Sequence, residues 1–563
     1  MRRQQNLFEI QVYQRDHWVI EGQEEDEATA VSFAKAQVGQ GKVEGMRVLR
    51  QWTRADGAVV ETEIFCQFRP KNDRITIQTV DAASRCEEIE EYYGTDSRFT
   101  VGRVLRQYLE EVVVTPTEIM HNFAELKRLR DKDALVPSAI GHVAQVQAGG
   151  SGDGRARRDE MFNVLEKMTV RARNASRREL PNIKTIGFSR LFAELSTSAA
   201  DERPDFLSLV ALSRELVNMR NFALKVQFLV GLLTKEEGMS PESTAIIDGV
   251  IADVLGSASV IQELLGPQPN LMTAIINLCD LAEGKLDTSK RHAEEFAIPN
   301  NKQFAEGRLP SSRMVLLDWV RRQLKGTQPL NRHEPAKERE TFTRLLQRMV
   351  GPGGVIGGGP VAEGLTLRRV QYQDDGGVPG RQRAVQSICD DMPDPANRLR
   401  FLLATLDSGL VLQVGEFIRA RIDATLSRVG GFVNPQRPVK DNLAVLTAIW
   451  REVRDCAAPE ADRRRVMQRI DDLLVGYIEM SKIIERLDDP TAILRYRAIR
   501  LIQLCASGAL ESPRALDVAR RRVIEHLRQP RFEEEFVSDI EDPETRAKAL
   551  KDFYDLLMRA GFR

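Results

Sequence analysis

Beyond about residue 85, apolar side chains recur every three to four positions along most of the chain. Phe342, Leu345, Leu346 and Met349, for example, are spaced i, i+3, i+4 and i+7, and Gly351 follows where a left-handed helix cap is expected. This spacing places the four side chains on one face of a helix. Because such a face must be buried against another element, the sequence predicts a body of packed helices.

Helix–glycine–helix units occur at three places, with turns predicted at Gly238, Gly409 and Gly508. In the last two units an Asp-Pro pair opens the first helix, and a Ser-Gly pair ends it. A hairpin of this kind cannot bury its own apolar stripe and must stack on its neighbours. The sequence therefore predicts stacked helical hairpins, either as an α-solenoid-like array or as helical bundles. It leaves open whether the units arose by duplication.

The first 82 residues have a different period. Phe8, Ile10 and Val12 alternate with polar residues, which is typical of a half-buried strand. A second short strand is predicted at 18–20, a helix at 24–38, and a hairpin around Asp56-Gly57. These elements predict a small α+β domain of ββαββ order, to which residues 75–80 add a possible edge strand.

The predicted fold is therefore mainly α with a small N-terminal α+β domain. The predicted domains are residues 1–82, a helical domain at 83–350 with a flexible loop near 145–158, and a helical-hairpin domain at 386–563. Residues 351–385 contain GPGGVIGGGP and DDGGVPG, lack helical periodicity, and are predicted to be a linker between the two helical bodies.

The composition and charge of the chain narrow the cellular compartment and the classes of partner that we expect. Lys and Arg number 81 and Asp and Glu 82, so the chain has no overall basic field that would attract nucleic acid. The six cysteines form no C-x-x-C pair, which favours reduced thiols over a disulfide framework. No apolar run approaches the ~20 residues of a membrane span, and no signal-peptide core follows the N-terminus. We expect a cytoplasmic protein without a membrane span.

No motif commits the chain to a reaction, a cofactor or a metal. The glycine-rich run at 351–360 lacks the Gly-Lys-Ser/Thr of a phosphate loop, and no strand precedes it as a dinucleotide motif requires. The six histidines are scattered without metal-ligand spacing, and paired aspartates at predicted helix ends are typical of helix caps. We assign no catalytic, cofactor-binding or metal-binding residue and expect no cofactor.

Two groups of residues are candidates for an interaction surface. The first is the face of the N-terminal sheet that the predicted helix leaves free. The aromatic and cationic side chains that could lie on this face are Trp18, Trp52, Arg47, Arg50 and Arg54. The second comprises arginines in two C-terminal helices, Arg463, Arg464, Arg521 and Arg522. The alternative interpretations are that both tryptophans pack under the helix, and that the arginines belong to solvated faces with salt bridges to nearby acidic residues.

Three hypotheses of function follow. The first is a non-catalytic scaffold or adaptor that binds a protein partner, or a second copy of itself, through helical-repeat-like surfaces. The second is a nucleic-acid-associated protein that uses the N-terminal sheet and the arginine-rich helices. The third is an enzyme whose dispersed active site lies between the two helical bodies, which requires a cavity where several charged residues converge.

Overall fold

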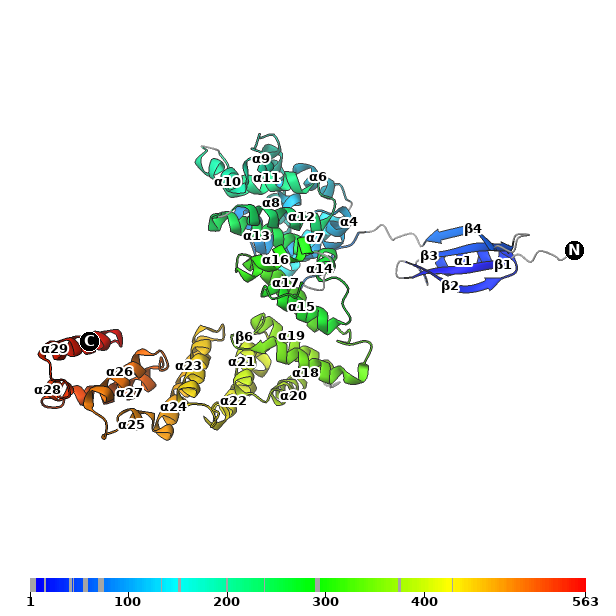
Figure 1. The fold of residues 1–563 in the computed structure, drawn as a ribbon. Coiled ribbons are helices and arrows are strands. Elements are labelled where there is room, and N and C mark those ends of the chain that lie inside the picture. The colour runs from blue at the N-terminus through cyan, green and yellow to red at the C-terminus, as the bar shows by residue number, and fades with distance from the viewer. Residues whose placement is uncertain are drawn as a thin grey trace. The chain divides into compact units, whose positions relative to one another are not determined.

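A computed structural model describes the chain except for residues 1–6, 15–16, 40–42, 44, 54–58, 69–74, 133, 150–152, 199–200, 237, 289–293, 373–375, 428 and 563. The described residues form two compact units (Figure 1). Residues 1–79 with 133–139 make up the sheet unit, and residues 80–132 with 140–563 make up the helical unit.

The sheet unit contains β1 (Leu7–Gln14), β2 (His17–Glu24), α1 (Glu27–Gly39), β3 (Gly45–Thr53) and β4 (Val59–Phe68). The strands form an antiparallel sheet in the order β2-β1-β3-β4, and this arrangement confirms the ββαββ prediction. The turn containing Asp56-Gly57 lies outside the described residues.

One face of the sheet packs against α1. Alternation along the strands places one set of apolar side chains on this face, because successive residues of a strand point to opposite sides. The buried cluster consists of Phe8, Ile10, Val12, Met46 and Val48 from the sheet and Ala30, Ala34 and Val38 from the helix.

The predicted edge strand at 75–80 is absent, since these residues have no regular secondary structure. Val80 is instead buried in the helical unit, where its amide donates to His142 Nε2 at 2.9 Å. The prediction of a further strand is therefore wrong.

Helices dominate the rest of the chain, as the apolar periodicity predicted (Figure 1). Up to residue 325 they are α2 (Ile89–Tyr92), α3 (Thr95–Val104), α4 (Arg106–Val112), α5 (Pro116–His121), α6 (Phe123–Arg130), α7 (Leu135–Ala148), α8 (Gly154–Ser176), α9 (Ile183–Ile186), α10 (Phe188–Thr197), α11 (Pro204–Leu216), α12 (Phe222–Lys235), α13 (Pro241–Leu255), α14 (Ala258–Leu265), α15 (Leu271–Ala282), α16 (Glu294–Ala305) and α17 (Pro310–Lys325). The loop predicted near 145–158 is shorter than expected, because α7 extends to Ala148 and α8 begins at Gly154.

Beyond residue 325 the elements are a 3-10 turn (Pro335–Lys337), α18 (Glu338–Met349), β5 (Val350–Gly351), β6 (Gly354–Val355), α19 (Gly358–Gln371), α20 (Gly377–Asp390), α21 (Pro395–Leu406), α22 (Val411–Thr425), a 3-10 turn (Val429–Gly431), α23 (Val439–Asp455), α24 (Glu460–Ser481), α25 (Ile483–Leu487), α26 (Leu494–Ala506), α27 (Pro513–Leu527), α28 (Phe532–Phe536) and α29 (Pro543–Arg559). In each predicted hairpin the two helices contact each other: α12 with α13, α21 with α22, and α26 with α27.

The glycine-rich stretch at 351–385 is not the helix-free linker that its composition predicted. It forms the short hairpin β5–β6, all of α19 and the start of α20, and Val361 and Leu365 of α19 are buried. Helix α19 packs against both α17 and α21. A Cβ atom on Gly359 would lie 2.3 Å from the carbonyl oxygen of Asp407, so glycine permits a close approach of two helices here rather than flexibility.

Buried carboxylates join helices that are distant in the sequence. Asp248 of α13 accepts from the amides of Ser311 and Ser312, at 2.6 and 3.0 Å, in the first turn of α17. These amides have no partner within their own helix, so a carboxylate from another helix satisfies them. The same role is filled by Asp253 for α5, Glu236 for α10, Glu110 for α14 and Asp471 for α27. We call these contacts cross-helix caps.

A buried ion pair also links two helices. Lys225 of α12 and Glu118 of α5 are both completely buried, and Lys225 Nζ donates to both Glu118 carboxylate oxygens at 2.7 Å. Lys225 also donates to the carbonyl of Val113 at 2.6 Å, and Glu118 accepts from the amide of Thr115 at 2.8 Å. Every charge in this contact is therefore matched.

Candidate functional site

Trp18 and Arg47 lie together on the face of the sheet that α1 leaves open. The Arg47 guanidinium stacks over the Trp18 ring at 4.6 Å from its centroid, and Trp18 packs against Tyr13 and Phe68. Trp18 therefore does not pack under the helix. Arg50, three positions beyond Arg47 in β3, faces the opposite side.

The described part of the open face is not basic. Arg47 Nε donates to Gln11 at 2.7 Å, and its guanidinium lies 3.6 Å from the carboxylate of Glu63. Glu9 and Glu61 are also on this face, where each accepts from Gln51. Three carboxylates thus accompany one guanidinium. Trp52 belongs to β3, but its side chain and all of Arg54 lie outside the described residues.

Three of the four C-terminal arginines have local partners. Arg464 pairs with Glu460 one helical turn away, Arg522 pairs with Asp488 at 2.5 Å and Glu525 at 2.8 Å, and Arg463 donates to the carbonyl of Arg454 at 2.8 Å. Arg521 is exposed and forms no hydrogen bond or ion pair with another described residue. Arg464 thus matches the alternative of a solvated, salt-bridged face, whereas Arg522 shares the buried carboxylate of Asp488 with Arg497 and His526.

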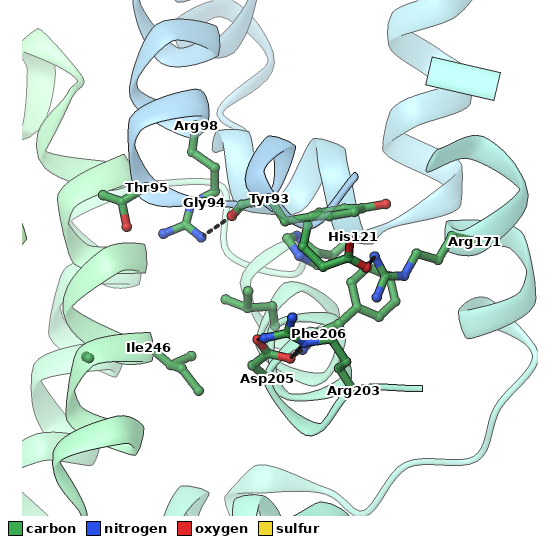
Figure 2. Close-up of a pocket in the computed structure, with 13 residues that line it drawn as sticks. Tyr93, Gly94, Thr95, Arg98, His121, Arg171, Arg203, Asp205, Phe206 and Ile246 are labelled. Atoms are coloured by element: carbon green, nitrogen blue, oxygen red, sulfur yellow. Dashed lines mark hydrogen bonds and ion pairs between the residues drawn. The ribbon is translucent and has the colours of Figure 1, made fainter. Parts of the chain in front are cut away.

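A cavity of about 240 Å³ lies among α3, α5, α8, α11 and α13 (Figure 2). Its wall consists of Glu90, Tyr93, Gly94, Thr95, Arg98, His121, Arg171, Arg203, Asp205, Phe206, Leu209, Ala245 and Ile246. We call it the His121 cavity. No local pattern in the sequence indicates this cavity, since His121 is one of the scattered histidines and its neighbours come from distant segments.

His121 is a neutral hydrogen-bond acceptor at the wall of this cavity. Its Nδ1 lies 2.8 Å from the carbonyl of Thr117, which only accepts, so Nδ1 carries the proton. Its Nε2 is buried and has no hydrogen-bond partner among the described residues. Burial lowers the pKa of His121 to about 3, and the positive charges of Arg98 and Arg171 act in the same direction. The ring therefore stays unprotonated at neutral pH.

Arg171 covers the aromatic part of the cavity. Its guanidinium lies 4.1 Å from the Phe206 centroid and 4.9 Å from that of Tyr93, and both rings contact His121 (Figure 2). Two hydrogen bonds of 2.5 and 2.9 Å join Arg171 to Glu202. Burial is the main cause that raises the pKa of Tyr93, so its hydroxyl stays protonated.

The other cations of the cavity are also paired. Arg98 donates to the carbonyl of Tyr93 at 2.9 Å, drawn as a dashed line in Figure 2, and lies 3.1 Å from Asp253. Arg203 pairs with Asp205 at 2.7 Å. The cavity thus offers aromatic surface, paired charges and two polar groups without a hydrogen-bond partner among the described residues, the Nε2 acceptor of His121 and the hydroxyl of Tyr93, a set that suits binding of a neutral polar ligand.

The enzyme hypothesis placed an active site between the two helical bodies, in a cavity where charged residues converge. Charged residues do converge in the His121 cavity, but its wall lies entirely within residues 90–246, inside the first of those bodies. Proton transfer at neutral pH, however, is most efficient with a group whose pKa is near 7. A histidine with a pKa of about 3 has no proton to donate there and is a weak base. Its wall of described residues contains no cysteine, lysine or serine that could act as a nucleophile.

The described residues contain neither an evident metal-binding cluster nor a single helix that could span a membrane. No group of three or more His, Cys, Asp or Glu among the described residues is placed to hold a metal ion. Within the same residues no single helix is long and apolar enough to cross a membrane. The pair α13 and α14 passes that test only together, and a bend of 94° separates them.

No protein-family model, curated protein or solved structure matches this chain. Its function must therefore be argued from its own geometry.

Proposed function

We propose that the protein is a non-catalytic, cytoplasmic scaffold that binds a protein partner through the outer surfaces of its helical unit. The observation that carries this proposal is the use of carboxylates as cross-helix caps. Asp248, Asp253 and Asp471, whose side chains are buried, and the half-buried Glu110 and Glu236 all cap other helices. In an enzyme, such carboxylates could serve as acids or bases. In this protein they fix the positions of helices relative to one another, as a rigid binding surface requires.

Large apolar side chains on the outside of the helical unit supply candidate contacts. Leu412 of α22 is 90% exposed, Met558 of α29 67% and Met480 of α24 64%. Methionine is enriched at protein interfaces because its flexible thioether adapts to different partners. The three residues lie on separate helices, which favours recognition along an extended surface over recognition in one deep site.

The sheet unit supplies a second docking surface. Phe68 and Ile20 are 49% and 59% exposed, and Phe68 packs on Trp18. Because Glu9, Glu61 and Glu63 share the open face with a single paired arginine, this surface suits a basic or apolar peptide better than a phosphate backbone. This charge balance is why we favour a protein partner over nucleic acid.

Site-specific crosslinking tests the proposal. A photo-reactive amino acid is placed at Leu412, Met480 or Met558 of the full chain in its native cells, and at Arg464 as a control on a salt-bridged face. The proposal expects one discrete crosslinked species from at least one apolar position and none from the control. Light scattering of the pure protein shows whether that species is a second copy of the chain. A monomer that forms no specific adduct at any of the three positions would overturn the proposal.

The nucleic-acid alternative has its own test. Binding of single-stranded and duplex DNA and RNA is measured at low salt, where phosphate contacts are strongest. The nucleic-acid alternative would be preferred to the scaffold proposal if the affinity for DNA or RNA falls steeply with added salt and is lost in the Arg47→Gln variant.

A further inference from the structure

Arg103 and Arg106 are half-buried, and each guanidinium lies over an aromatic ring, Phe99 and Trp319 respectively, but neither has a hydrogen-bond or ion-pair partner among the described residues. Arg103 lies near the end of α3, and Arg106 opens α4. Neither side chain forms a hydrogen bond or an ion pair, and Arg106 Nε is buried without an acceptor. This sets them apart from Arg98, Arg171 and Arg203, each of which pairs with a carboxylate. A buried guanidinium without an acceptor is unfavourable, so its retention calls for an explanation.

A third cation, Arg322 of α17, lies nearby. The Trp319 ring is contacted by the guanidinium of Arg106 at 4.7 Å and by that of Arg322 at 4.1 Å. Arg322 Nη2 is also buried without an acceptor. Burial, followed by the positive charges of Arg106 and Arg103, lowers the pKa of Arg322 to about 10. The three arginines thus repel one another across a buried tryptophan.

Among the described residues, the carboxylates around these arginines pair with Arg322 but form no hydrogen bond or ion pair with Arg103 or Arg106. Asp318 is held by Arg321 at 2.7 Å and by Arg322 at 2.9 Å. Glu110 caps α14, and Asp253 pairs with Arg98. Asp96 also lies in the wall near these groups but forms no ion pair with Arg103 or Arg106. Unmatched guanidinium donors therefore remain at this place.

A cavity adjoins these donors. It measures about 190 Å³, and Arg103 and Arg106 lie in its wall together with Ser311, Met314 and Asp318. The wall also contains Arg98 and the carboxylates of Asp96 and Asp253, and Asp253 pairs with Arg98. Thr95 and Arg98 line both this cavity and the His121 cavity, so the two cavities are neighbours.

From this geometry we infer that Arg103 and Arg106, in the wall of this cavity, form a binding site for the phosphate group of a small ligand. An oxyanion beside these two side chains accepts their unmatched guanidinium N–H groups and reduces the repulsion between them and the neighbouring Arg322. Arginine is suited to this role because its planar fork presents several donors to one phosphate. This site is independent of the scaffold proposal, which concerns the outer helix surfaces.

Thermal unfolding of the full chain tests the inference. The Tm is measured in sodium phosphate and pyrophosphate, and in sodium chloride and acetate of the same ionic strength. A ligand that binds only the folded protein raises the Tm, so phosphate is expected to raise it and chloride is not. A response to acetate equal to that to phosphate, or no response to phosphate, would overturn the assignment.

Variants assign the effect to the site. Arg106→Met is expected to weaken phosphate binding at least tenfold and to unfold, without phosphate, at the wild-type temperature or above it, because an uncompensated charge is removed. Arg103→Met tests the same point if Arg106→Met does not fold. The control Arg464→Met removes an exposed cation with its own partner and is expected to leave the phosphate response unchanged.

Tryptophan fluorescence tests whether phosphate binds next to Trp319. A purely structural role of Arg106 would not make this fluorescence respond to phosphate. Phosphate is expected to change the tryptophan emission of the wild type but not that of Arg106→Met, because Arg106 stacks on the ring. A wild-type phosphate response retained in both Arg106→Met and Arg103→Met would refute the site.

Discussion

Replacing Lys225 by Met is expected to destabilise the helical unit strongly. The substitution removes the cation that donates to both oxygens of Glu118 and to the carbonyl of Val113, all in a fully buried place. Breaking a buried pair by removing one member leaves an uncompensated charge, which costs about 3–5 kcal/mol. The assay is urea unfolding of the full chain at pH 7.5, followed by circular dichroism at 222 nm.

Two comparisons distinguish the lost charge from lost packing. The double variant Lys225→Met/Glu118→Gln has no buried charge at this place and is expected to be more stable than Lys225→Met alone. Burial raises the pKa of Glu118, so the uncompensated carboxylate takes up a proton as the pH falls. A raised pKa in the folded state favours folding at low pH, so the deficit of Lys225→Met relative to wild type should shrink from pH 7.5 to pH 5. A deficit under about 1 kcal/mol, or one that is equal at both pH values, would refute the reasoning.

Two further predictions concern other contacts. Burial opposes the ionisation of Asp488, but its contacts with His526 and Arg522 lower its pKa, so the ionised group stabilises the fold at neutral pH. Asp488→Asn should cost about 2–3 kcal/mol at pH 7 and progressively less as the pH falls below 3.8, the ordinary pKa of the group, and a loss that does not shrink there would contradict this. Gly359→Ala should lower the free energy of unfolding in urea by about 1–3 kcal/mol, because the new Cβ would lie 2.3 Å from a backbone carbonyl oxygen. The control Gly351→Ala has open space around the new Cβ and should be nearly neutral. Equal effects of the two substitutions would contradict the close approach at Gly359.

The regular elements could be predicted because their signals are local. The alternation of Phe8, Ile10 and Val12 indicated a strand with one buried face, and the structure packs these three side chains against α1. The spacing of Phe342 and Leu346 likewise indicated a helix, which α18 confirms with both residues fully buried. In both cases the neighbouring residues alone carry the information.

The glycine-rich stretch shows where local reading fails. Glycine breaks helices in isolation, so residues 351–385 were predicted to be a linker. Gly359 and Gly364 instead lie inside α19, where each faces another part of the fold at short range, a backbone carbonyl for Gly359 and Leu324 for Gly364. Whether a glycine provides flexibility or a close approach depends on a partner that the local sequence does not reveal.

The candidate sites could not be predicted for a similar reason. Arg464 and Arg106 are both arginines in helical patterns. Arg464 forms an ion pair with a carboxylate four residues away, whereas Arg106 forms no ion pair or hydrogen bond with a described residue. The environment of His121 comes from five helices, and its low pKa is caused mainly by burial. Burial and long-range pairing are properties of the assembled fold.

The cross-helix caps determine where this chain can be divided. Asp248 lies 63 residues before the serine whose amide it accepts from, and Glu110 lies 148 residues before Ala258. A truncated version ending between α13 and α17 would remove the amides that Asp248 accepts from and expose the face of α13 that packs on α17. Such a piece is expected to aggregate when expressed alone, because apolar surface that α17 covers would be open to water. We therefore expect the part of the helical unit that these caps join, from Glu110 to Ser312, to fold only as a whole.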